Sequence, residues 1–126
     1  MIGAGSTRVV SSPEELWQRT KQFALRIIKL FRALPKTEEA RVLGRQLLRS
    51  GSGVAANYRS ACRARSRADF VSKIGITVEE ADETAFWLEL LVDAGIVRGA
   101  RLENLLAEAN ELVRIFAATR ATARSR

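Results

Sequence analysis

The chain has 126 residues, of which 47% are hydrophobic and 28% are charged, so it fits one globular domain with a single hydrophobic core. It contains no histidine, which removes the commonest general base and metal ligand, and its single cysteine excludes an intramolecular disulfide. The net charge of +7 favours an anionic partner, either nucleic acid or an acidic protein.

The first helix has a clear start signal. Ser12 can cap it, Pro13 suits the first helical position, and Glu15 completes a capping box. Pro35 disfavours the α conformation in the residue before it, so we expect the helix to end near Leu34. Its apolar stripe recurs at helical spacing and comprises Leu16, Trp17, Phe23, Ala24, Ile27, Ile28, Phe31 and Leu34.

The second helix should begin after Thr37, which can cap it, and it contains the unusual stretch Ser50-Gly51-Ser52-Gly53. Each glycine costs about 1 kcal/mol relative to alanine inside a helix. Two structural alternatives are open: a close helix–helix approach or kink, or a break into two shorter helices. A phosphate-binding loop is not supported, because no Walker lysine follows and no strand precedes the stretch.

The third helix is predicted to begin after Ser66 and to end near Gly95, a residue suited to a left-handed C-terminal cap. The fourth is predicted from about Ala100 to about Ala118. Four helices of similar length with short loops favour an all-α, antiparallel up-down four-helix bundle. In domain terms, the sequence predicts a flexible N-terminus over residues 1–11, the bundle over residues 12–119 and a flexible basic tail over residues 120–126.

Seven arginines are the candidate nucleic-acid-binding residues. Three of them recur at i, i+4 and i+8 in the second helix and share one face, and four straddle its end. Arginine forks match phosphate geometry, so this surface would bind nucleic acid with a marked salt dependence. The alternatives are pairing with the acidic third helix, a set of arginines that only keeps the protein soluble, and contact with a protein partner. The seven residues are Arg41, Arg45, Arg49, Arg59, Arg63, Arg65 and Arg67.

Acidic residues gather in the third helix. Residues 69–99 hold seven Asp and Glu against two Lys and Arg, whereas residues 1–68 hold four against fourteen. We interpret the cluster as a solvated face that forms salt bridges with the second helix, or alternatively as a contact surface for another chain. A metal site is not favoured without histidine, and no cofactor is expected. The cluster comprises Glu79, Glu80, Asp82, Glu83, Glu89 and Asp93.

Few other residues suggest chemistry. If Asn57 is buried it needs a hydrogen-bond partner, for which Glu80 and Glu83 are the candidates. Cys62 is interpreted as an inert thiol, and no serine has a histidine- or lysine-based activating arrangement, so the protein is predicted not to be an enzyme. The aromatic residues Trp17, Phe86 and Trp87 are predicted to lie in the core or at an interface.

No segment has the length and apolar character of a signal peptide or a transmembrane helix. We therefore expect a cytoplasmic protein without a membrane partner.

Several motifs between residues 13 and 118 also occur together in one known family. They are Trp17, Leu34-Pro35-Lys36-Thr37-Glu38, Gln46-Leu47-Leu48-Arg49-Ser50, Val54-Ala55-Ala56-Asn57-Tyr58-Arg59, Asp69-Phe70, Lys73-Ile74, Glu79-Glu80-Ala81-Asp82-Glu83, Phe86-Trp87-Leu88-Glu89-Leu90-Leu91 and Ala94-Gly95-Ile96. This set resembles the small bacterial four-helix-bundle family, also called the 23S ribosomal RNA intervening-sequence proteins.

The resemblance implies a barrel-like homopentamer, encoded within or near ribosomal RNA insertions or standing alone. A related protein, the accessory variability determinant of diversity-generating retroelements, binds a reverse transcriptase and nucleic acid. Where most members end the second helix with an Ile-Ala-Glu-Gly-like stretch, this chain has Tyr58-Arg59-Ser60-Ala61. We expect a non-catalytic homo-oligomer that binds RNA or an RNA–protein assembly through its basic surface. The alternative is an interaction scaffold or accessory subunit, for example of a reverse-transcriptase-like enzyme, without direct nucleic-acid contact.

Overall fold

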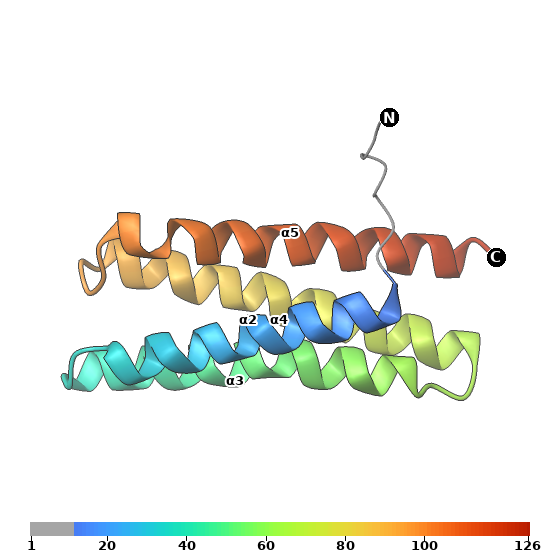
Figure 1. The fold of residues 1–126 in the computed structure, drawn as a ribbon, viewed down its shortest axis with the longest axis horizontal. Coiled ribbons are helices and arrows are strands. Elements are labelled where there is room, and N and C mark those ends of the chain that lie inside the picture. The colour runs from blue at the N-terminus through green and yellow to red at the C-terminus, as the bar shows by residue number, and fades with distance from the viewer. Residues whose placement is uncertain (1–11) are drawn as a thin grey trace.

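The computed structural model describes residues 12–126, which form four α-helices and no strands (Figure 1). The predicted flexible N-terminus, residues 1–11, lies outside the described residues. Successive helices run antiparallel and are joined by short loops, which confirms the predicted all-α up-down bundle. None of these helices combines the length and the apolar character needed to cross a membrane. The helices are α2 (Pro13–Ala33), α3 (Glu38–Cys62), α4 (Arg67–Asp93) and α5 (Gly99–Arg124).

The predicted helix boundaries are confirmed where a local cap sets them. The Ser12 backbone N–H donates to Glu15 Oε1 at 2.9 Å and the Glu15 N–H donates to Ser12 Oγ at 3.1 Å, which completes the capping box. Thr37 and Ser66 cap α3 and α4 in the same way, through the backbone N–H three residues on. Gly95 follows α4 with a positive φ of 74°, the conformation that favours glycine.

Helix α5 extends further than predicted. It was expected to end near Ala118 but continues to Arg124, so most of residues 120–126 are helical rather than an irregular tail. The stretch contains no glycine or proline, and its alanines and arginines are good helix formers. No local signal therefore stops the helix where its apolar stripe ends.

Helix α3 runs unbroken through Gly51 and Gly53, which confirms the predicted close approach and excludes the break. A Cβ atom at Gly51 would lie 2.8 Å from Cγ1 of Ile27, so only glycine lets α2 come this close. Next to it, the hydroxyl groups of Ser50 and Thr84 are buried and lie 2.9 Å apart, and they form a polar contact between α3 and α4. The small residues of this stretch therefore bring three helices together.

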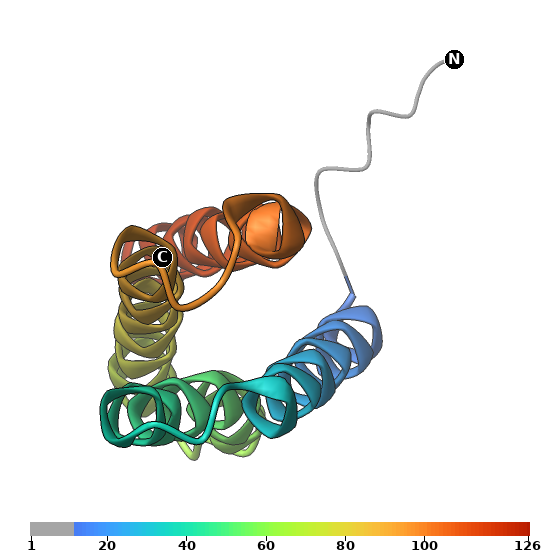
Figure 2. The ribbon, with the colours of Figure 1, turned by 90° about the vertical axis from the view of Figure 1, so that its left-hand side faces the viewer.

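The four helices lie around a common axis in chain order (Figure 2). Consecutive helices pack along their lengths, whereas α2 and α5, the first and last, touch only slightly. Arg19 on α2 bridges this seam, with its guanidinium donating to both carboxylate oxygens of Glu108 at 2.7 and 2.9 Å. The largest fully buried side chains of the core are Phe23, Ile27, Leu47, Ile74, Leu88, Leu91, Leu112 and Phe116.

Candidate nucleic-acid interface

The outward face of α3 carries an exposed stripe that is rich in arginine. Its members are spaced by three or four residues and all are exposed. Because 18 residues make five helical turns, Arg59 repeats the angular position of Arg41, and Arg63 that of Arg45, about 27 Å further along the axis. The only acidic residues of α3, Glu38 and Glu39, lie in its first turn. We define the α3 stripe as Arg41, Arg45, Arg49, Ser52, Ala56, Arg59 and Arg63.

Arg49, at the middle of the stripe, is the arginine that pairs with the acidic helix. Its guanidinium lies 3.4 Å from Glu80 Oε1 and 2.8 Å from Glu83 Oε1. The hydrogen bond to Glu83 is the main cause that raises the pKa of Arg49. Burial raises the pKa of Glu80, although the charge of Arg49 opposes this. The predicted salt bridges between the acidic cluster and the second helix are therefore present at this point.

The other six candidate arginines are not neutralised in this way. All are exposed, and within residues 12–126 none has a carboxylate oxygen within 4.0 Å of its guanidinium. The alternative that the candidate arginines pair with the acidic third helix is therefore wrong for six of the seven. Arg49 divides the remaining charges into two clusters, one at each end of α3.

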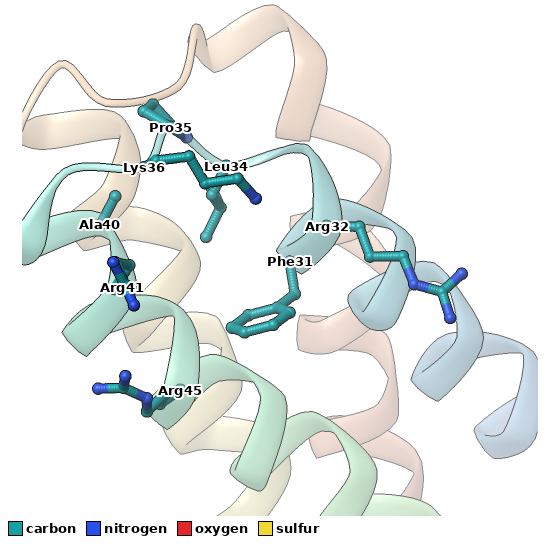
Figure 3. A pocket seen from close by; sticks show the side chains of 8 residues that line it. All are labelled: Phe31, Arg32, Leu34, Pro35, Lys36, Ala40, Arg41 and Arg45. Atoms are coloured by element: carbon teal, nitrogen blue, oxygen red, sulfur yellow. The ribbon is translucent and has the colours of Figure 1, made fainter.

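The first cluster surrounds a hollow of about 570 Å³ at the turn between α2 and α3 (Figure 3). Arg41 and Arg45 approach it from α3, Arg32 belongs to α2, and Lys36 belongs to the turn. The Phe31 ring lies between the two helices at its floor. None of its described lining residues is acidic, so the charged side chains around the hollow are all basic, although the Arg32 guanidinium points away from it in Figure 3. The sequence analysis did not include Arg32 and Lys36, although they flank the proline turn that leads into α3.

The second cluster lies at the turn between α3 and α4, around a hollow of about 550 Å³. Arg59, Arg63 and Arg65 line it together with Lys73 and Asp69. Lys73 Nζ donates to Asp69 Oδ2 at 3.2 Å, so this pair largely cancels and the three arginines stay uncompensated. The sequence prediction missed Lys73, which lies one turn after Asp69 and reaches back to it. Arg67 lines a separate groove at this end of the bundle.

The outward face of α4 differs from the α3 stripe in charge and in apolar exposure. The carboxylates of Glu79, Asp82, Glu89 and Asp93 are exposed on it. Two large apolar side chains are also exposed on this helix: Ile76 at 40%, about one turn before Glu79, and Phe86 at 51%, between Asp82 and Glu89. Phe86 is therefore not a core residue; its ring lies against Trp87 with the centroids 4.9 Å apart.

Two other sequence predictions concern single side chains. The expected bond from Asn57 to Glu80 or Glu83 is wrong: Asn57 Nδ2 donates to the carbonyl oxygen of Gly53 at 2.8 Å, one turn back in the same helix. Cys62 is half-buried, and its sulfur accepts a hydrogen bond from the Trp17 indole at 3.2 Å. Among residues 12–126, no three acidic or cysteine side chains are grouped so as to hold a metal ion.

The fold and this charge arrangement can be compared with known proteins. A crystal structure of a protein of unknown function from the S23 ribosomal protein family of Bacteroides thetaiotaomicron VPI-5482 superposes with a TM-score of 0.81. The two chains are 32% identical, and the match covers 86% of this chain and 97% of that one. No curated protein matches the chain. Residues 14–118 match the family described as 23S rRNA-intervening sequence protein, and the chain therefore belongs to this family.

Proposed function

We propose that this protein is a non-catalytic, homo-oligomeric bundle that binds RNA, or an RNA–protein assembly, through the α3 stripe. The observation that carries the proposal is the stripe itself, where five of seven exposed positions are arginines and, among residues 12–126, only Arg49 has a carboxylate partner. Arginines that neutralise phosphates release condensed counterions, which drives binding. The family description names 23S rRNA, which favours RNA as the nucleic acid.

The chemistry of the stripe supports contact with the phosphate backbone. Between the two arginine clusters the stripe contains Arg49, Ser52 and Ala56. The small side chains of Ser52 and Ala56 leave room for a nucleic-acid strand to lie close to the helix. Phosphate contacts position a nucleic acid but carry no sequence information. We therefore expect binding with little base preference along the length of α3.

The test is a salt titration of binding to a labelled single-stranded RNA, measured by fluorescence anisotropy between 50 and 200 mM salt. The double variant with Arg45→Gln and Arg63→Gln removes one arginine from each cluster. Its binding should be weaker, and the slope of log K against log salt should be shallower by roughly 1.4, about 0.7 for each lost contact with a single strand.

A matched control is Arg101→Gln with Arg114→Gln, two exposed arginines of α5 whose loss changes the net charge equally. This variant should keep the wild-type slope. An absence of RNA binding at 50 mM salt would overturn the proposal. Equal losses in the two double variants would show that net charge, and not the stripe, is responsible.

The alternative is an interaction scaffold or accessory subunit, for example of a reverse-transcriptase-like enzyme, that has no direct nucleic-acid contact. The acidic face of α4, with exposed Ile76 and Phe86, favours it. The basic stripe of a second copy has the complementary charge, and in this alternative α4 of a neighbouring copy covers the stripe in place of RNA. Such contacts between unlike surfaces can close into rings. The homopentamer implied by the family resemblance would be one such ring.

Sedimentation at several protein concentrations tests the oligomer. Phe86→Ser should dissociate it, because an interface loses about 25 cal/mol for each Å² of apolar area that is no longer buried. Leu25→Ser on α2 is the matched control, since Leu25 is 49% exposed and Phe86 is 51% exposed. A wild-type protein that is monomeric at every concentration would remove the homo-oligomeric part of the proposal.

A further inference from the structure

A groove of about 890 Å³ lies at the end of the bundle where α2 begins and α3 ends. All four helices contribute to its walls. Three aromatic residues line it, Trp17, Tyr58 and Phe70, and the two charged residues among its described lining are Arg67 and Arg126. The described lining of the groove is therefore apolar and aromatic, with two arginines and no Asp or Glu residue.

Trp17 is exposed but held in place. Its side chain is 44% exposed, and its Nε1 donates to Cys62 Sγ at 3.2 Å. Behind it Tyr58 is 4% exposed, and burial raises the pKa of Tyr58, with smaller contributions from Cys62 and from the charge of Glu14. An exposed ring that is already fixed loses little conformational freedom when a ligand stacks on it.

The turn between α3 and α4 joins this groove to the second arginine cluster. Ala61, Cys62, Ala64 and Arg67 face the groove, whereas Arg59, Ser60, Arg63 and Arg65 face the basic hollow on the other side. An aromatic surface and a set of uncompensated arginines are thus separated only by the width of one chain segment. Single-stranded nucleic acid needs both of these on neighbouring sites, since its bases stack on aromatic rings and its phosphates bind cations.

We propose that this groove receives an unpaired base of single-stranded RNA, which stacks on Trp17 while Arg63, Arg65 and Arg67 bind the flanking phosphates. This inference rests on the proposed function and specifies its ligand, because a base inside a duplex is stacked on its neighbours and cannot enter. Stacking on an aromatic side chain tolerates any base. Trp17 is therefore a general single-strand contact and not a sequence reader.

Tryptophan fluorescence tests the contact directly in the full chain carrying Trp87→Phe, which leaves Trp17 as the only tryptophan. The Trp87 Nε1 is buried without a hydrogen-bond partner, so this substitution removes no bond. A single-stranded oligoribonucleotide should quench the Trp17 emission. The duplex of the same sequence, and polyphosphate as a polyanion without bases, should bind at low salt without quenching it.

Binding assays separate stacking from charge. Trp17→Leu keeps an apolar side chain but should weaken single-strand binding by about 5- to 150-fold, the usual range for one base–aromatic stack, and leave polyphosphate binding unchanged. Trp17→Phe should retain most of the affinity. Leu25→Ala, at a similarly exposed apolar residue of α2, should have no effect.

Single-strand binding that persists without quenching and without a loss in Trp17→Leu would overturn the stacking inference and leave the α3 proposal intact. No binding of any RNA would overturn both. A Trp17 emission that changes with protein concentration in the absence of RNA, and then no longer responds to RNA, would show that a second copy covers the groove and would also overturn the inference.

Discussion

Gly51→Ala tests the contact that sets the spacing of α2 and α3. The added methyl would lie 2.8 Å from Cγ1 and 2.9 Å from Cγ2 of Ile27, well inside the 3.5–4.0 Å of ordinary carbon contacts. Ile27 is fully buried and branched at Cβ, so it cannot rotate away at low cost. Overpacking of this kind costs about 1–3 kcal/mol. With two atoms of a fixed side chain in the way, we expect the upper half of that range.

The alanine also gains about 1 kcal/mol in helix propensity, which leaves a net loss of about 1–2 kcal/mol. For a chain of this length, each kcal/mol lowers the melting temperature by about 4 °C, so thermal unfolding at fixed concentration should show a fall of about 4–8 °C. Gly53→Ala is the matched control: its methyl meets only the carboxylate group at the end of the Glu80 side chain, whose carbon lies at 3.1 Å, and a small shift of that side chain makes room, so it should stabilise by up to about 1 kcal/mol. A Gly51→Ala protein as stable as the wild type would refute the close approach.

Three further predictions concern polar contacts. Burial raises the pKa of Glu80 above its ordinary 4.5, so the protonated Glu80 carboxyl favours the folded state. This contribution to the free energy of unfolding is fully present below the pKa that Glu80 has in the unfolded chain, and it is lost as pH rises through the pKa that Glu80 has in the folded protein. Glu80→Gln should flatten this dependence in urea unfolding between pH 4 and 7. Thr84→Val removes the buried bond to Ser50 and should cost about 1–2 kcal/mol in the same assay. Arg19→Lys loses the two-point contact to Glu108, and a double-mutant cycle should give a coupling of about 1 kcal/mol.

The parts of the fold that could be predicted are those set within one or two helical turns. The caps at Ser12, Thr37 and Ser66 each join a side chain to a backbone N–H three residues away, so the sequence contains both partners. The end of α4 at Gly95 was equally local. The end of α5 was predicted wrongly, at about Ala118, where its apolar stripe ends. A helix made of good helix formers can continue beyond the surface on which it packs.

Contacts between helices were harder to predict. The sequence predicted either a close helix–helix approach or a break at Gly51 and Gly53, but only the structure identifies Ile27 as the neighbour of Gly51. Asn57 was assigned to a carboxylate on the next helix, yet the carbonyl oxygen of Gly53 one turn back satisfies it. Residue spacing places the arginines on one face of α3, but it does not show whether that face is exposed or packed against another helix.

The distribution of charge also bears on the proposed binding of a phosphate backbone. The two arginine clusters lie about 27 Å apart, whereas charges are screened over about 8 Å at physiological ionic strength, so each cluster acts alone on a small anion. Exposed single contacts of this kind are worth roughly 1 kcal/mol or less. An extended polyanion that reaches both clusters turns the second contact into an intramolecular one, with a correspondingly higher effective concentration. On the proposed function, we therefore expect a long phosphate backbone to bind more tightly than single nucleotides, which a competition assay with a mononucleotide would check.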